Sequence, residues 1–188
     1  ASGEAIHTNT EVAALPLPPH VHEELAPLVA VWGPLGDQLA AVDATLTAIA
    51  ASDPVVTRLR TMPSIGPITA LAFVAALDDV SRFPNAHQVQ GYLGLVPSEY
   101  SSGDRRVRGR ITKRGDVRLR WLLVETGWRI LRAPNADLQG LRAWGLRIAA
   151  RRGKRIAAVA LARRVAGILY AMWRDDAPFH AVPFAEAA

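Results

Sequence analysis

Cysteine is absent from this chain of 188 residues. We also recognise neither a membrane-spanning apolar run nor a secretory signal peptide in the sequence. Without cysteine there is no disulfide framework and no thiolate metal site, which fits a reducing cytosol. We see no apolar run of about 18 residues and therefore predict no membrane span. The stretch ASGEAIHTNTEVAALPLPPH lacks a basic start followed by an apolar block, so we do not interpret it as a signal peptide.

Motifs for metals, nucleotides and serine hydrolases are also missing. We interpret the HVH stretch at 20–22 as incidental rather than as a metal site, because the histidines are scattered. No glycine-rich phosphate loop is present, and GLVPSEYSSG is not the strand–elbow–helix context of a hydrolase serine. We therefore expect no metal site and no cofactor in this chain. The histidines are His7, His20, His22, His87 and His180.

Helix-forming residues dominate what is present. Half of the residues are hydrophobic, and most of these are alanine and leucine rather than runs of β-branched residues. Apolar residues recur at helical spacing between Pro, Gly and Asn-Asp interruptions. The expected helices are 21–35 with a break around Gly33-Pro34, 37–51, 54–61, one after Gly66-Pro67, 85–92, one from Asp116, 136–151 and 154–174. The expected buried stripes are Leu119, Leu122, Leu123, Thr126 and Ile130 in one helix, and Leu161, Val165, Ile168, Leu169 and Met172 in the last.

The stretch PSEYSSGDRRVRGRITKRG at 97–115 differs from the rest of the chain. Proline and several glycines exclude a regular helix there, so we interpret it as a loop with a short hairpin. The predicted fold is therefore mainly α, with a short β hairpin or extended loop near 95–112. A serine hydroxyl and guanidinium groups, which bind phosphate in a bidentate manner, stand together in this stretch. On spacing alone this is weak evidence for catalysis.

Positive charge is concentrated in two segments, although the formal net charge is only +5. Residues 103–120 hold eight bases and two acids, and residues 142–164 hold eight bases and no acid. Localised positive charge is typical of a protein that binds a polyanion, so we predict a nucleic-acid partner. The alternative is an arginine-rich surface that is merely solvated.

The stretch TMPSIGPITALAFVAAL at 61–77 has the pattern of a helix-hairpin-helix turn. We expect Gly66 to form a tight turn, with Gly66, Ile68 and Thr69 offering backbone N–H groups to a phosphate at the start of the next helix. The alternative is a plain turn between two core helices.

These motifs together resemble the C-terminal serine domain of the insertion sequence one-ten (IS one-ten) family of DEDD-type transposases, the bridge-RNA-guided recombinases. The resemblance covers about residues 55–175. It depends on the blocks MPSIGPITALAFVAAL, YLGLVPSEYSSG and ITKRGDVRLRWLL, which stand in the family's order and spacing.

The resemblance implies an N-terminal RuvC-like domain with four acidic metal ligands, a helical linker, and a serine that attacks DNA to form a phosphoserine link. The serine is best matched by Ser102, with Ser101 as second choice. Mg²⁺ is expected only with the acidic domain, which is missing from this chain, so the chain would hold half of the active site. Six cations are expected to bind phosphates in this chain, with Arg118 as a further candidate: Arg105, Arg106, Arg108, Arg110, Lys113 and Arg114.

The resemblance also implies the organisation and the partners. We expect a flexible arm at 1–20, a helical linker at 21–54, the transposase domain at 55–175 and a tail at 176–188. The expected partners are DNA, a guide (bridge) RNA and a second copy of the chain, with no membrane, in the bacterial cytoplasm at the nucleoid. Two alternatives stay open: a non-catalytic or degenerate nucleic-acid-binding module, and an assembly module that pairs through helices 22–51 and 154–174.

Overall fold

The computed structural model describes residues 16–102 and 105–181, with the side chains of 99–108 outside that description. The chain divides into two units at residues 48 and 49, and each is described by itself. The helices and strands are α2 (Pro19–Ser52), α3 (Pro54–Leu59), α4 (Pro67–Leu77), η1 (Val80–Arg82), α5 (Ala86–Tyr92), β1 (Pro97–Ser102), β2 (Arg105–Ile111), α6 (Val117–Arg132), η2 (Ala136–Leu138), α7 (Gln139–Arg152) and α8 (Lys154–Arg174). The predicted mainly α fold with a small antiparallel sheet is confirmed.

The first unit consists of most of α2, a helix of 34 residues that runs through Pro27 and Pro34 without ending. The predicted break around Gly33-Pro34 is therefore wrong. A proline inside a helix removes one backbone hydrogen bond and kinks the helix, but the flanking turns keep their own bonds. The helix begins at Pro19, where the missing proline N–H costs nothing, so Pro19 and His20 of the predicted arm are already helical.

The apolar side chains of α2 remain largely exposed within the described residues. Leu39, Val42 and Ile49, which recur at helical spacing and predict an amphipathic helix over 37–51, are all exposed. Ala50 is the one residue of α2 that is buried, and it lies in the second unit. The predicted linker helix is therefore present, whereas its apolar face has no cover within its own unit.

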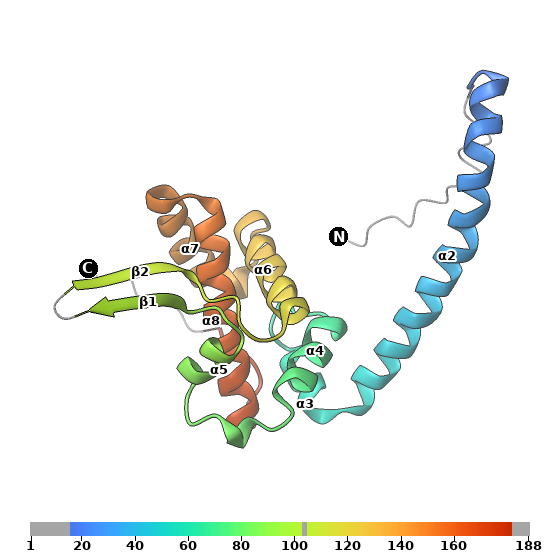
Figure 1. The fold of residues 1–188 in the computed structure, drawn as a ribbon. Coiled ribbons are helices and arrows are strands. Elements are labelled where there is room, and N and C mark those ends of the chain that lie inside the picture. Colours follow the sequence, from blue (N-terminus) through green and yellow to red (C-terminus); the bar gives the residue numbers. More distant parts are fainter. Residues whose placement is uncertain (1–15, 103–104, 182–188) are drawn as a thin grey trace. The chain divides into compact units, whose positions relative to one another are not determined.

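The second unit is built around α8. Figure 1 shows this helix running through the unit, with α6 and α7 beside its first half and α5 beside its second. Its bounds are the predicted ones, and four of the five stripe residues are buried, with Ile168 partly buried. Glycines permit the closest contacts: a Cβ at Gly127 of α6 would overlap the carbonyl oxygen of Ala158, and one at Gly145 of α7 would lie 2.7 Å from Leu161.

The starts of the shorter helices follow from side chains that accept backbone N–H groups. Asp53 caps α3, Asn85 caps α5, and Asp116 caps α6 by accepting from Leu119 N at 2.6 Å. The buried side of α6 contains Leu119, Leu123, Thr126 and Ile130 of the predicted stripe, whereas Leu122 is only half-buried. These caps and stripes position the segments between the helices, including the hairpin.

The predicted hairpin is present as β1 paired antiparallel with β2. Its register pairs Pro97 with Ile111 and Glu99 with Arg108, with an irregularity between those pairs. The hydroxyl of Ser98 donates to the carbonyl oxygen of Arg110 at 3.0 Å, which is a second link between the strands near their base.

Two helices, α2 and α8, are long and apolar enough to cross a membrane by length and composition alone. This differs from the expectation that no such run exists. Half of the apolar stretch of α8 is buried against the other helices, as in a core helix. Length and composition alone are weak evidence for a membrane span in either helix.

Candidate nucleic-acid interface

The base of the hairpin is fixed by two close backbone crossings. Gly94 (φ +67) precedes β1 and Gly115 (φ +75) follows β2. A Cβ at Gly94 would overlap the backbone of Arg114, and a Cβ at Gly115 would overlap the carbonyl oxygen of Tyr92. Both positions therefore require glycine, for space and for backbone conformation.

A buried arginine ties these two segments together. Arg120 in α6 is only 8% exposed, and its Nη1 donates to Leu93 O at 3.1 Å and to Arg114 O at 2.7 Å. The segments before β1 and after β2 are thus both bonded to one guanidinium group. Lys113, which has φ +57, adds a backbone bond from its N–H to Gly94 O at 3.2 Å. The hairpin consequently leaves the helical unit from a defined position.

Sequence reasoning counted Arg120 among the bases of a polyanion-binding cluster and missed its structural role. The available signal was its position: it follows Leu119 and precedes Leu123 by three residues, so it lies next to the buried stripe of α6. Gly94 and Gly115 carried no comparable signal, because their partners are distant in sequence.

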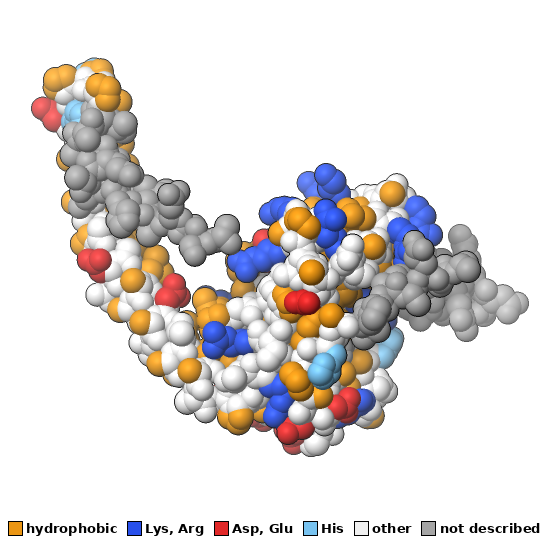
Figure 2. All heavy atoms as spheres, turned by 180° about the vertical axis from the view of Figure 1, so that it is seen from behind, with side chains coloured by type: hydrophobic (Ala, Val, Ile, Leu, Met, Phe, Trp, Pro, Cys, Tyr) orange, Lys and Arg blue, Asp and Glu red, His pale blue; other side chains and the backbone are white. Residues whose placement is uncertain are grey.

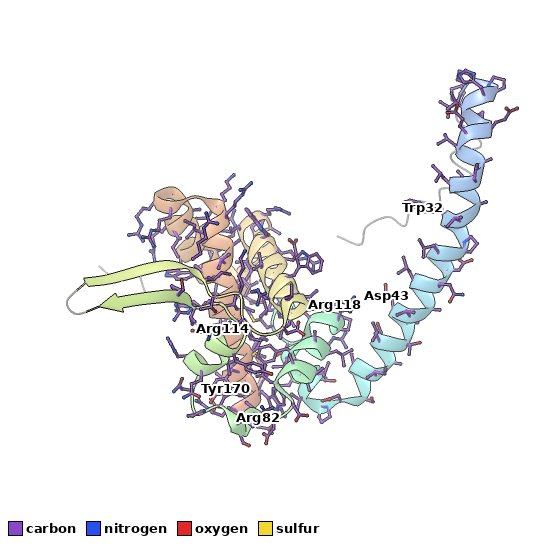
Figure 3. All side chains as sticks on the ribbon, viewed as in Figure 1. Trp32, Asp43, Arg82, Arg114, Arg118 and Tyr170 are labelled. Carbon is purple, nitrogen blue, oxygen red and sulfur yellow. The ribbon has the colours of Figure 1, made fainter. Side chains whose placement is uncertain are left out.

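Four of the predicted phosphate-binding cations have described side chains, and all are exposed: Arg110, Lys113, Arg114 and Arg118. Figure 3 shows Arg114 at the base of the hairpin and Arg118 at the start of α6. These four cations thus lie near the same end of α6. They surround the two hydrogen bonds from Arg120 to Leu93 O and Arg114 O, which we call the clamp. Exposed guanidinium and ammonium groups at this density attract phosphates over a Debye length of about 8 Å.

The predicted nucleophiles lie at the far end of β1. In the register of the hairpin, Ser101 is opposite Arg106 and Ser102 is opposite Arg105. The side chains of Ser101, Ser102, Arg105, Arg106 and Arg108 lie outside the described residues. The backbone nevertheless places each candidate serine beside a candidate phosphate-binding position.

The connection between α3 and α4 differs from the expected helix-hairpin-helix turn. Gly66 has φ −87 and does not use the positive φ that glycine permits in a tight turn; the positive φ of 73 belongs to Ser64 instead. Gly66 is the N-cap residue just before α4 and provides no side-chain cap, and Ile68 is 45% exposed. The side chain of Thr69 packs inward and only 8% of it is exposed, so only its backbone could meet a phosphate.

The second basic segment lies on α7 and α8. Arg151, Arg152, Lys154 and Arg155 flank Gly153 and are all exposed, whereas Arg163 donates to Gln90 Oε1 at 2.8 Å. Arg164 lies over the ring of Trp144, 5.0 Å from its centroid. Figure 2 shows groups of Lys and Arg side chains on the surface of the helical unit. In this segment some cationic side chains are exposed, whereas Arg163 and Arg164 contact neighbouring side chains.

The described carboxylates form no metal-binding group and show shifted pKa values only away from the hairpin. Among residues 16–102 and 105–181, no group of three or more His, Asp or Glu could hold a metal ion. Two carboxylates with shifted pKa values lie elsewhere: hydrogen bonds from Ser81 lower the pKa of Asp79, and hydrogen bonds from Arg174 lower that of Asp175.

Comparison with known proteins identifies a domain in this region. Residues 56–140 match the model of the Transposase IS116/IS110/IS902 family. The chain is 35% identical over 127 residues to the transposase for insertion sequence element IS1111A of Coxiella burnetii, covering 68% of this chain and 35% of that protein. It is 34% identical over 163 residues to a probable family 20 transposase of Pseudomonas aeruginosa, covering 87% of this chain and 48% of that one.

A third relative is the transposase for insertion sequence element IS1328 of Yersinia enterocolitica, which is 31% identical over 163 residues, 87% of this chain and 49% of that protein. Residues 56–140 are thus similar to the domain that this family model describes. The chain spans about a third to a half of the length of the relatives it matches. All three of these relatives carry the name transposase.

Proposed function

We propose that this chain, through its domain of the Transposase IS116/IS110/IS902 family, is the C-terminal part of an insertion-sequence transposase, which binds DNA and carries the serine that joins strands. The observation that carries the proposal is the hairpin register, which puts Ser101 and Ser102 opposite Arg106 and Arg105. The base of that hairpin is anchored by Arg120 and surrounded by exposed cations.

The proposed reaction is attack of a serine hydroxyl on a phosphodiester. The Oγ–P bond forms, one bridging P–O bond of the DNA strand breaks, and the hydroxyl proton leaves while the departing strand end takes up a proton. Charge on the non-bridging oxygens increases in the transition state, and guanidinium groups held nearby stabilise it. Arg105 and Arg106 are the cations that the register places beside the serines, with Ser102 as the nucleophile and Ser101 as the alternative.

The described residues at the hairpin do not fit a Mg²⁺ site. Asp116, the nearest described acid in sequence, uses Oδ1 to cap α6, and no carboxylate cluster stands beside it among the described residues. Hard cations such as Mg²⁺ prefer several oxygen ligands. Any metal would therefore come with the acidic, RuvC-like domain that the resemblance implies.

The partners belong to the same proposal. DNA is the substrate, a guide RNA would select it, and a second copy of the chain would complete the assembly. The start of α4 has no side-chain cap; with Gly66 half-buried, Ile68 exposed and Thr69 offering its backbone, it is a further candidate phosphate contact. The bacterial nucleoid is the compartment where these partners meet.

The test is formation of a covalent protein–DNA adduct. The chain is incubated with duplex DNA, alone and with an acidic domain from a relative, and denaturing gels detect the adduct. We expect an adduct on the tryptic peptide 83–105, which carries Ser98, Ser101 and Ser102. Salt-sensitive DNA binding with no adduct in either reaction would favour the non-catalytic module, and no DNA binding at low salt would contradict the proposal altogether.

A further inference from the structure

We propose that Trp121, on the outer face of α6, is a stacking platform for an unpaired base of the DNA strand that is being joined. This rests on the proposed function for the identity of the ligand as DNA. The proposed contact is stacking of the face of the Trp121 indole ring on a nucleobase.

The exposure of Trp121 is the first observation. Trp121 is 60% exposed, and Val117, one helical turn earlier on the same face, is 69% exposed. Burying a tryptophan contributes more hydrophobic free energy than burying almost any other side chain. Leu119, Leu123 and Ile130 already provide the buried contacts of α6, so the exposed ring of Trp121 adds little to the stability of the helix.

The other tryptophans of this unit provide the comparison. Trp128 lies under the guanidinium group of Arg132 at 5.1 Å, Trp144 lies under Arg164 at 5.0 Å, and Trp173 packs against Phe73 at 6.4 Å. Each of these rings is partly buried and has an aromatic or cationic partner. Within the described part of residues 49–181, Trp121 is the tryptophan that has neither an aromatic nor a cationic partner.

The charges beside Trp121 indicate the ligand. Arg118 is three residues earlier and lies on the same face of α6, and Arg114 and Lys113 are exposed just before the helix. Glu125 is the one acid within α6. An exposed aromatic ring next to a line of cations is the combination by which proteins bind single strands: cations hold the phosphates and the ring stacks on a base. A protein partner with an apolar surface would have to desolvate these cations.

An unpaired base is the form of DNA that this ring can use. In a duplex both faces of a base are stacked on neighbours, so an indole ring cannot reach them without unstacking. Attack of the serine on the phosphodiester breaks a bridging P–O bond and releases a strand end, whose last bases are then free to leave their old partners. Trp121 sits at the end of α6 from which the hairpin leaves, so it lies near the route of such a strand.

The test compares single-stranded and double-stranded DNA. Binding of the 188-residue chain to a strand of about 16 nucleotides, and to the same sequence as a duplex, is measured by fluorescence anisotropy for Trp121→Ala, Trp121→Phe and Trp32→Ala. Trp32 is the matched control, since it is an exposed tryptophan on α2. Thermal melting confirms that the variants are folded.

We expect Trp121→Ala to weaken single-strand binding by about fivefold to a hundredfold, the effect of losing one base–aromatic stack, and to leave duplex binding within about twofold. Trp121→Phe should restore most of the affinity, and Trp32→Ala should behave as wild type. The salt dependence should not change, because no cation is removed.

Three results would overturn the inference. Unchanged single-strand binding in Trp121→Ala would do so, as would equal losses for single strand and duplex. A change in oligomeric state without a change in strand affinity would assign the ring to a protein contact instead. The adduct assay is independent: an adduct with unchanged single-strand binding refutes only the role of Trp121, whereas a wild-type chain that binds neither DNA refutes both proposals.

Discussion

The base and the strands of the hairpin are built differently. At the base, Gly94 and Gly115 allow backbone crossings, and a buried Arg120 bonds both segments. Beyond it, β1 and β2 pack mainly on each other. Arginines occur in both regions, and their burial differs. Arg120 is buried and bonds two backbone segments, whereas Arg110, Arg114 and Arg118 are exposed and available to a ligand.

The largest effect is expected at the base, from Gly115→Val. A β-branched residue there would need φ near +75 and would overlap the carbonyl oxygen of Tyr92. We expect a loss of about 3 kcal/mol or more in the free energy of unfolding, measured by urea denaturation. An unchanged midpoint and slope would show that the crossing is not needed.

Arg120→Met should have the next largest effect. It leaves Leu93 O and Arg114 O without their donor in a buried place, which costs about 2–4 kcal/mol. Arg118→Met is the matched control, because Arg118 is exposed on the same helix and its loss should cost less than about 0.5 kcal/mol. Equal melting of the two variants would remove the distinction between base and surface.

Neutralising the exposed cations should leave stability unchanged and weaken binding. The triple change of Arg110, Lys113 and Arg114 to Gln should reduce the log–log salt slope of duplex binding by about 2.7, or about 0.9 for each cation. The control replaces Arg60, Arg82 and Arg174, which lie away from the hairpin, with Gln. If both triple variants lose affinity equally, only the net charge matters and not the hairpin base.

The smallest effect is expected from Gly66→Val. Because Gly66 has φ −87 and no atom lies within 4 Å of a Cβ built there, valine fits without strain. We expect a change of less than about 1 kcal/mol in thermal or urea unfolding. A loss as large as that of Gly115→Val would restore the tight turn that the sequence suggested.

These contrasts also show what the sequence could predict. The bounds of α8 and the stripe of α6 follow from apolar periodicity, which is local information, and the structure confirms them. The hairpin follows from glycines and proline that exclude a helix. The break at Pro34 is wrong because local proline rules give only a preference, which the continuous helix overrides.

The clamp at the hairpin base could not be predicted, because it depends on contacts between residues that are distant in sequence. Arg120 Nη1 reaches Leu93, 27 residues away, and Gly115 meets Tyr92. In the sequence Arg120 is one of eight bases in a charged segment, and only burial separates it from the rest. The roles of Ser101 and Ser102 come from the resemblance and stay predictions.

The most direct test of the central claim is the adduct yield of three single serine variants in β1. Ser102→Ala should abolish the covalent DNA adduct while the melting temperature and DNA affinity stay close to wild type, since alanine removes the attacking oxygen and no cation. Ser98→Ala is the matched control: it loses the bond to Arg110 O but should keep the adduct. Loss of the adduct only in Ser101→Ala would move the nucleophile by one residue. An adduct that survives the double change of Ser101 and Ser102 would contradict the serine mechanism.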